Sequence, residues 1–598
     1  MIRNLSDFIQ ILKQENEIIE IQSEVDPYLE IAEIHRRVIA AEGPALLFTN
    51  VKGSKFPVVT NLFGNDKRVN LAFGKKPYEF IKNAAKLPEE LMPPSPKKIW
   101  EKKDFFLDFL KVGLKNKSDG AVRQVKVSPP KLTELPMLTS WIEDGGAFVT
   151  LPLVYTEHPD NKTHNLGMYR IHRYDDETTG IHWQIGKGGG FHYQIAESRN
   201  QALPVNLTIG GPPALILSAI APLPENVPEL ILSSLLLGGK LDLCKNPNGG
   251  LPLISEAEFV AVGKVPPHKR RPEGPFGDHY GYYSLQHDYP VFEVETLFHK
   301  KNAIYPATVV GKPKQEDFFI GDYLQELLSP LFPIVMPGVL DIWSYGETGY
   351  HSLSGTVVKE RYPREGMMSA FRILGEGQLS LTKFLLVTDK PQDLKDFKSF
   401  FTYILARADF SRDLFIFDNL SMDTLDYSGP EVNKGSKGIL LGFGEPIRKL
   451  PQSIPALENP IRDAKVYCPG CLVVESQSFS ENPKLPEVIA KLEFLKEFPL
   501  VVLVDSAEEA TRTTSRFLWT VFTRFEPAAD IYANDTKLVR NSISYTPPIV
   551  IDARKKPSYP KELFCDEGTA KLVDKKWKTY FPSGKVEMGE SDRGHLDY

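Results

Sequence analysis

Cysteine is scarce in this chain, with four residues among 598, and the scarcity excludes a disulfide framework. Cys468 and Cys471 form a CxxC pair, but Cys244 and Cys565 lie far away in the sequence. A structural zinc site needs a second ligand pair, which this arrangement does not supply. We therefore expect reduced, partly buried thiols in a reducing compartment.

Long apolar runs and a strong charge of one sign are also lacking. The net charge is −6 and basic residues are interspersed with acids, which argues against nucleic acid as a partner. The apolar stretches 203–223 and 228–239 are broken by proline or too short to span a bilayer. The N-terminus has no apolar signal core. The sequence therefore predicts a soluble, cytoplasmic protein.

What remains predicts an α+β multidomain protein. Residues 1–118 alternate helical and strand-like runs and fit an N-terminal α+β domain, which opens with an amphipathic helix. Residues 119–318 hold short runs rich in β-branched and aromatic residues between turn formers, typical of an antiparallel barrel or sandwich. We expect an α/β domain at 319–470 and an extension with a related α/β unit at 471–598.

The C-terminal half contains an internal repeat. LLVTD at 385–389 resembles VVLVD at 501–505. Each is followed by an arginine, Arg407 or Arg524, and then by an aspartate at the same distance. We interpret these segments as two related strand-helix-strand units, with a chance likeness of α/β sequence as the alternative.

The segment EGPFGD places two carboxylates, Glu273 and Asp278, on one short turn. Gly274 and Gly277 permit backbone geometries that other residues resist, and Pro275 fixes one dihedral angle. The two acids can therefore face one cavity. The alternative is a solvated turn whose acids only contact water.

Three other segments carry polar groups suited to a phosphate or a metal. Asn165 and Arg170 lie in NLGMYR. The alternative interpretation of this segment is an edge strand with a surface arginine. Lys187 lies in a glycine-rich run whose N–H groups can approach a phosphate; a flexible hairpin tip is the alternative, because the run matches no nucleotide fingerprint. Glu229 begins an apolar helix, where an acid also suits the helix dipole.

Together these segments resemble the UbiD family of decarboxylases, which use prenylated FMN. The motifs that carry the resemblance, in order, are Thr150-Leu-Pro, NLGMYR, His182-Trp-Gln, Val227-Pro-Glu229, EGPFGDHYGYY and Thr382-Lys383-Phe. The likeness covers about residues 18–450, and the chain's length is similar to that of members assigned to menaquinone biosynthesis. It implies an N-terminal α+β domain, a central FMN-binding split β-barrel and a C-terminal α/β domain that mediates oligomerisation as a dimer or hexamer.

The resemblance also implies the binding residues. Asn165 and Glu229 match ligands of Mn²⁺, or Mg²⁺, which anchors the cofactor phosphate. The positions that match cofactor contacts are Thr150, Met168, Tyr169, Arg170, His182, Trp183, Gln184, Lys187, Gly188 and Lys383. Gly186 stands where many members have a histidine, which in some of them completes the metal shell, so the third ligand here is expected to be His182, His192 or water. Ala219 and Ile220 stand where members often have Ser or Thr near a K⁺ site.

Arg170, Glu273 and Asp278 match the family's catalytic residues. Arg170 would hold Glu273 and also meet the substrate carboxylate. Asp278 would supply the proton that the carbon needs after CO₂ leaves. We expect Glu273 or burial to raise the pKa of Asp278, so that Asp278 carries this proton near neutral pH.

The function implied is a non-oxidative, reversible carboxy-lyase acting on an aromatic or α,β-unsaturated acid, with a hydroxybenzoate or dihydroxynaphthoate of ubiquinone or menaquinone biosynthesis as the expected substrate. The alternatives are a phenolic or aryl acid decarboxylase of catabolism or detoxification, and a flavin-binding protein without activity. The expected partners are a flavin prenyltransferase that supplies the cofactor, other copies of the chain, and a membrane surface where the substrate is prenylated.

Overall fold

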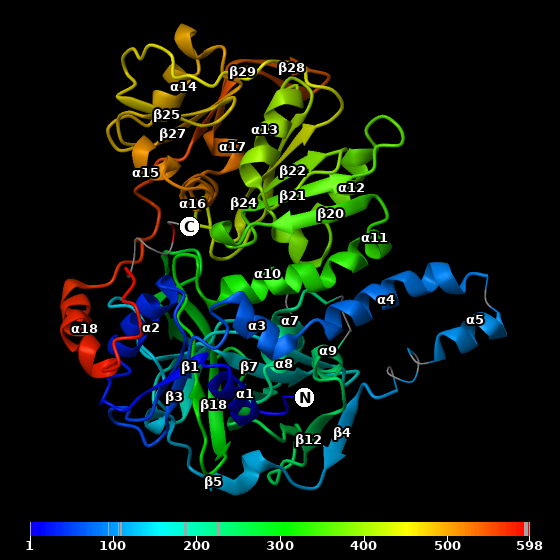
Figure 1. Ribbon diagram of the computed structural model, residues 1–598, viewed down its shortest axis with the longest axis vertical. Helices are drawn as coiled ribbons and strands as arrows, with labels where there is room; N and C mark the ends of the chain where they lie inside the picture. The colour runs from blue at the N-terminus through cyan, green and yellow to red at the C-terminus, as the bar shows by residue number, and fades with distance from the viewer. Residues whose placement is uncertain are drawn as a thin grey trace. The chain divides into compact units, whose positions relative to one another are not determined.

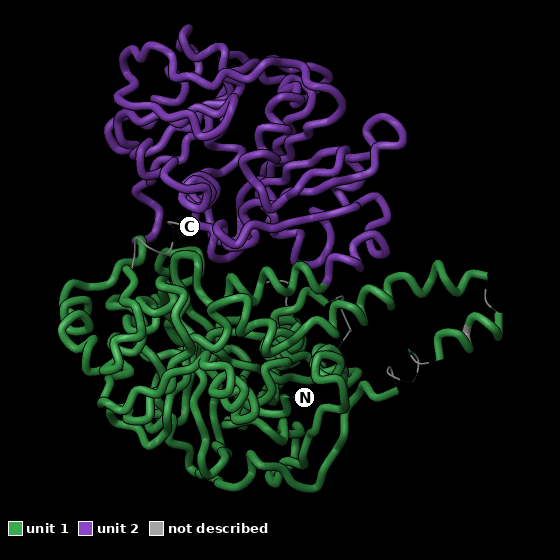
Figure 2. Tube along the Cα trace, in the orientation of Figure 1, with its two compact units in different colours: residues 1–327, 562–595 green, residues 328–561, 596–598 purple. Residues whose placement is uncertain are grey.

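The computed structural model describes residues 2–93, 95–103, 105, 107, 110–184, 188–223, 228–590 and 596. The chain forms two compact units (Figure 2). Unit 1 comprises Met1–Leu327 and Glu562–His595, and unit 2 comprises Leu328–Lys561 and Leu596–Tyr598. The α+β multidomain class that the sequence predicts is confirmed.

Unit 1 begins with the predicted amphipathic helix, α1 (Leu5–Gln14). Asn4 caps it by accepting a hydrogen bond from the backbone of Asp7, and its apolar face is buried. A four-stranded sheet of order β1-β2-β3-β19 follows. The elements of this region are β1 (Ile18–Ile21), α2 (Glu30–Ala40), β2 (Ala45–Phe48), β3 (Val58–Thr60), α3 (Asp66–Phe73), α4 (Lys76–Leu91), α5 (Pro96–Glu101) and β19 (Tyr305–Pro306).

The centre of unit 1 is a large antiparallel sheet with the strand order β6-β9-β10-β18-β14-β11-β7-β8, and β5 and β15 both pair with β18. Within the described residues this order is an open path, so the sheet does not close into a complete barrel. Its strands are β5 (Val125–Val127), β6 (Phe148–Val149), β7 (Pro152–Glu157), β8 (His164–Gly167), β9 (Ile171–Arg173), β10 (Thr178–Ile181), β11 (Leu203–Ile209), β14 (Phe259–Val265), β15 (Arg270–Glu273) and β18 (His287–His299).

Shorter elements surround this sheet. The apolar helix predicted to begin at Glu229 is α9 (Glu229–Leu237), whereas α7 (Gly188–Ser198) and α8 (Ala214–Ile220) come from segments for which the sequence analysis names no helix. The remaining elements are β4 (Leu114–Lys117), β12 (Leu241–Cys244), β13 (Leu253–Ile254), β16 (Phe276–Gly277), β17 (Tyr283–Ser284) and α10 (Glu316–Leu328).

Unit 2 contains the predicted repeat. Its two five-stranded sheets, β20-β21-β22-β24-β23 and β25-β26-β27-β29-β28, have the same strand order and the same pattern of parallel and antiparallel pairing. LLVTD forms most of β22, VVLVD forms most of β27, and a helix that ends at the predicted arginine follows each strand. This agreement in topology favours duplication over a chance likeness.

The first copy in unit 2 consists of α11 (Phe332–Val335), β20 (Val339–Ser344), β21 (Leu353–Val358), α12 (Glu365–Leu374), β22 (Phe384–Thr388), α13 (Phe397–Arg407), β23 (Leu414–Ser421) and β24 (Lys434–Gly442). The second consists of β25 (Asp463–Cys468), β26 (Cys471–Glu475), α14 (Leu485–Ile489), β27 (Leu500–Val504), α15 (Ala507–Thr511), α16 (Thr514–Arg524), α17 (Pro527–Asp530), β28 (Ile531–Val539) and β29 (Ser542–Asp552). The two copies share one hydrophobic core.

After unit 2 the chain returns to unit 1, where α18 (Glu567–Tyr580) packs beside α2 (Figure 1). Val573 and Tyr580 of this helix join the main core of unit 1. Among the described residues, no helix combines the length and the apolar character needed to cross a bilayer.

Candidate functional site

Arg170, Glu273 and Asp278 form one hydrogen-bonded cluster in unit 1. Arg170 donates from Nε and Nη2 to the two carboxylate oxygens of Glu273, each at 2.8 Å. Its Nη1 donates to Asp278 Oδ2 at 2.6 Å. The side chains are 9%, 0% and 11% exposed, so the ion pairs are screened from water. The structure thus brings together the three residues that match the family's catalytic residues, and their catalytic role stays a prediction.

Strand register explains why the cluster forms. Arg170 directly precedes β9 and His182 directly follows β10, and these strands pair so that the His182 N–H donates to the Arg170 carbonyl. Glu273 is the last residue of β15, which pairs with β18 beside β10. Glu273 thus ends one short strand and Asp278 directly follows another, β16. The sequence predicts only a turn for this segment.

The electrostatics of Glu273 follow from its partners. Burial alone would raise its pKa. Arg170, and to a smaller extent His182, outweigh this effect and lower the pKa from 4.5 to about 2. Burial and the charge of Arg170 also lower the pKa of His182 below its ordinary value of 6.5, so this ring is neutral at pH 7. Glu273 is therefore an ionised partner of the arginine and carries no transferable proton at neutral pH.

This shift predicts how stability depends on pH. Because the pKa of Glu273 is depressed from 4.5 to about 2, its contribution to stability is present above pH 4.5 and is lost as the pH falls toward 2. Within that window the unfolding free energy of wild type should fall more steeply than that of Glu273→Gln, by up to about 1.4 kcal/mol per pH unit. Urea unfolding at a series of pH values measures both slopes, and parallel curves would contradict the assignment.

The expectation that the pKa of Asp278 is raised is wrong for this state of the protein. Burial does raise it, but the hydrogen bonds and charge of His279, together with the charge of Arg170, hold the pKa below its ordinary value of 3.8. His279 Nδ1 lies 2.8 Å from Asp278 Oδ1, and the backbone N–H of His279 donates to the same oxygen. Asp278 is therefore a carboxylate before substrate arrives.

Asn165 and Glu229 also meet, as predicted for metal ligands. Asn165 Nδ2 donates to Glu229 Oε1 at 2.8 Å, and Glu229 Oε2 accepts from the Leu166 N–H. A Cβ added at Gly188 would lie 2.8 Å from Asn165 Nδ2, so a larger residue at this position would collide with the Asn165 side chain. A carboxylate and an amide oxygen suit Mn²⁺ or Mg²⁺, and these two residues would hold such an ion. The described residues contain no group of three or more His, Cys, Asp or Glu side chains placed for a metal, so they do not complete the ligand set.

Most of the predicted cofactor contacts lie in unit 1. Tyr169 lies beside the Asn165–Glu229 pair: its hydroxyl donates to Asn165 Oδ1 and accepts from the Gly189 N–H, and its ring contacts Trp183 edge to face. Thr150 is buried and accepts from the Thr308 N–H. Met168, Gln184 and Gly188 are partly buried.

The remaining two predicted contacts are the lysines. Lys187, together with Gly186, lies outside the described residues. Lys383 lies in unit 2, where it forms a buried ion pair with Asp426 at 2.7 Å. Its role toward a phosphate stays a prediction.

Two of the predicted alternatives for the third metal ligand have other partners. His182 contacts Glu273 Oε2 through Nδ1, and its ring stacks on Tyr289 with centroids 4.3 Å apart. His192 contacts the Thr156 hydroxyl through Nδ1 at 2.8 Å. Thr156 is the register partner of Asn165 in the β7–β8 hairpin, so His192 lies near the Asn165–Glu229 pair and His182 belongs to the arginine cluster.

Asp144 and His279 contribute to the site although no sequence motif identified their roles. Asp144 accepts hydrogen bonds from the backbone N–H groups of Ser140, Trp141 and Gly277. Burial raises its pKa to about 7, although these N–H groups lower it. Asp144 thus ties the segment around Trp141 to the residue before Asp278.

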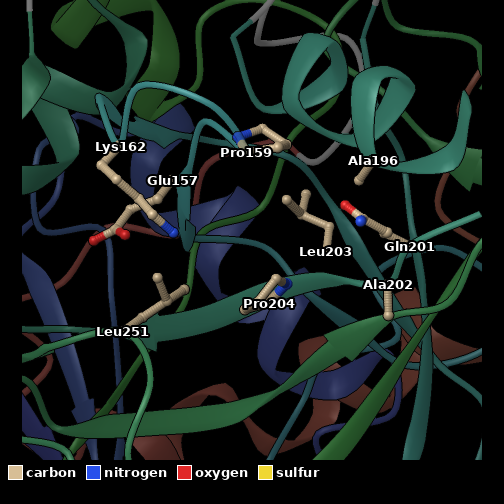
Figure 3. A pocket seen from close by; sticks show the side chains of 9 residues that line it. All are labelled: Glu157, Pro159, Lys162, Ala196, Gln201, Ala202, Leu203, Pro204 and Leu251. Atoms are coloured by element: carbon tan, nitrogen blue, oxygen red, sulfur yellow. The ribbon is translucent and has the colours of Figure 1, made fainter. Parts of the chain in front are cut away.

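Two cavities lie near these residues. One of about 290 Å³ is lined by aromatic and charged side chains, among them Trp183, Arg270 and Tyr289. The other, of about 170 Å³, lies between the β7–β8 turn and the chain that follows α7; Figure 3 shows Glu157 and Lys162 on one side of it and Gln201 on the other. The second contains none of the predicted site residues and is smaller than most ligand sites.

Comparisons with known proteins identify the family. Models of the N-terminal, Rift-related and C-terminal domains of 3-octaprenyl-4-hydroxybenzoate carboxy-lyase match residues 9–87, 114–313 and 318–442. A Chlamydia pneumoniae relative, named as a subunit of 4-hydroxybenzoate decarboxylase, is 49% identical over 578 residues, which cover 96% of this chain and 98% of the relative.

Solved structures share the fold. The closed form of Sedimentibacter hydroxybenzoicus vanillic acid decarboxylase has a TM-score of 0.65 at 24% identity, over 82% of this chain and 99% of that chain. The UbiD-class enzyme HmfF from Pelotomaculum thermopropionicum, solved with FMN, has a TM-score of 0.61 at 22% identity, over 76% of this chain and 97% of that chain. Because the family models match most of its length, the chain belongs to the UbiD family of carboxy-lyases.

Proposed function

We propose that this carboxy-lyase uses prenylated FMN to decarboxylate a small hydroxylated aromatic acid, with hydroxybenzoates as the first class and dihydroxynaphthoates as the second. The observation that carries the proposal is the buried cluster of Arg170 with two carboxylates, Glu273 and Asp278. The name of the C. pneumoniae relative and the FMN bound by HmfF support the substrate class and the cofactor.

Arg170 would bind the substrate carboxylate. Its Nε and Nη2 are committed to Glu273, so the carboxylate would take the place of Asp278 at Nη1. Glu273 would keep the guanidinium plane fixed during this exchange, because its carboxylate is fully buried and accepts two hydrogen bonds from Arg170. The residues thereby orient the bond that breaks before any chemistry occurs.

Asp278 would then change its protonation state. Release from Arg170 removes one of the causes that lower its pKa, and a proton passed on by His279 would also remove the hydrogen bond and charge that lower it most. His279, whose side chain is 24% exposed and contacts Asp278 Oδ1, is placed to return this proton from solvent. After CO₂ leaves, Asp278 would give the proton to the substrate carbon.

Prenylated FMN, when bound, supplies the electron-accepting centre that stabilises the charge developed on loss of CO₂. The residues that would hold it are Tyr169, Trp183 and Gly188, with Asn165 and Glu229 holding a divalent ion at its phosphate. Assembly of several copies, and the supply of cofactor by a flavin prenyltransferase, belong to the same proposal.

Co-expression with a flavin prenyltransferase tests this function. We expect the purified protein to show the absorption of a modified flavin and to release CO₂ from at least one hydroxybenzoate or dihydroxynaphthoate. A protein expressed without the prenyltransferase is the control and should be inactive. Prenylated cofactor bound without CO₂ release from any of these acids would overturn the proposed substrate class.

A further inference from the structure

We propose that the C-terminal return segment, residues 562–590, is a positioning element for the catalytic turn, residues 273–284, which carries Glu273 and Asp278. The return segment lies outside the residues that the family models match. It belongs to unit 1, so the chain comes back from unit 2 to reach this turn. The predicted effect on turnover rests on the proposed function, but the predicted effect on the turn itself does not.

The first residues of the return segment bond directly to the turn. Glu562 forms a β-bridge with Tyr282, and the Leu563 N–H donates to the Gly281 carbonyl at 3.0 Å. Within the turn, the Asp278 N–H donates to the carbonyl of the same Tyr282 at 3.1 Å. The backbone of Asp278 is therefore one hydrogen bond away from the residue that the return segment holds.

Side chains reinforce this backbone contact. Leu563 is fully buried and packs with Trp141 and Tyr283 in a small separate core. Trp141 in turn lies against Gly277, where an added Cβ would approach its Cδ1 to 2.1 Å. Leu563 thus packs in the same cluster as Trp141, the side chain that lies against the residue preceding Asp278.

An ion pair between Lys312 and Glu562 holds the beginning of the return segment in place. Lys312 Nζ lies 2.8 Å from Glu562 Oε1, with side chains 6% and 17% exposed, and also lies 3.8 Å from the ring centroid of Phe564. Charge-assisted hydrogen bonds of this kind are stronger when they are screened from water. This pair fixes Glu562 where it meets Tyr282.

Helix α18 anchors the rest of the segment to α2. Lys576 and Tyr580 both bond to the carboxylate of Glu30, and Asp574 pairs with Arg37. The neighbouring Arg36 lies 4.0 Å from the Trp141 ring centroid and donates to the Ser140 carbonyl. The anchor of the return segment and the support of the catalytic turn therefore meet on the same helix.

Glu562→Gln tests the proposal with little change in shape. We expect the backbone amides of residues 277–283 to exchange hydrogen about tenfold faster, because the variant removes one charge-assisted hydrogen bond that holds the turn. We expect kcat to fall by a similar factor while KM and the bound-cofactor spectrum stay as in wild type. The charge-swapped protein K312E/E562K should recover most of the amide protection.

The matched control is Glu567→Gln, which makes the same chemical change in an exposed ion pair with Lys571 on α18. It should leave the exchange of residues 277–283 unchanged. Equal exchange in wild type and Glu562→Gln, or equal acceleration in the control, would overturn the proposal. Because hydrogen exchange needs no substrate, this result stands even where the proposed decarboxylation fails.

Discussion

Arg170→Met is expected to lower turnover by at least about 10³-fold. It should also lower the unfolding free energy by about 3–5 kcal/mol. The variant removes the group that would hold the substrate carboxylate. It also leaves Glu273, which is 0% exposed, without the guanidinium that gives it two hydrogen bonds. Urea unfolding and CO₂ release on the cofactor-loaded protein measure the two effects.

A double variant separates these two roles of Arg170. Arg170→Met combined with Glu273→Gln removes the buried charge, so much of the lost stability should return, whereas turnover should not. Arg199→Met is the control, since it breaks a bidentate pair with Asp160 whose side chains are 42% and 55% exposed. It should cost no more than about 1 kcal/mol. Recovery of turnover in the double variant would contradict substrate binding by Arg170.

Short motifs were sufficient to find the three residues of the arginine cluster. Glu273 and Asp278 share one segment with two glycines and a proline, and Arg170 ends another recognisable hexapeptide. Their contact in space follows from strand pairing, which a resemblance to a known family supplies and composition alone does not. The internal repeat was predictable because its strands keep the same order in both copies and a helix that ends at an arginine follows the matching strand in each.

The supports of these residues were not predictable from local sequence. Asp144 and Gly277 are 133 positions apart, and neither lies in a motif that indicates a contact with the other. Leu563 lies more distant still from the turn it supports, in a segment of ordinary composition. Helix α8 was missed because all but its last residue are buried, so it has no amphipathic period. Long-range packing decides each of these features, and it leaves no periodic pattern.

The pKa of Asp278 shows how geometry can reverse an argument based on residue types. Two neighbouring acids predict a raised pKa for one of them. In the structure the hydrogen bonds and charge of His279, together with the charge of Arg170, lower the pKa of Asp278, and Arg170 also bonds to Glu273. A substrate carboxylate could therefore change the pKa of Asp278. If it displaces Asp278 from Arg170, it removes one of the causes that lower the pKa of Asp278.

Asp278→Asn is expected to keep its cofactor and to lose turnover by about 10²–10⁴-fold. The amide oxygen can still accept the His279 N–H, so the turn should fold as in wild type. It cannot carry a transferable proton, so formation of the protonated product should stop while binding of the acid at Arg170 persists. Absorption of the bound flavin, substrate titration and product formation measure these three quantities separately.

Exchange of the product in deuterated water sharpens this prediction. If the proposed proton transfer from Asp278 runs in both directions, wild type should exchange the ring hydrogen at the carbon that loses CO₂, and Asp278→Asn should not. Asp160→Asn, a change at an exposed aspartate, should exchange at the wild-type rate. Turnover or exchange near the wild-type level in Asp278→Asn would remove Asp278 from the proton-transfer step and leave His279, its hydrogen-bonded neighbour, as the group to test next.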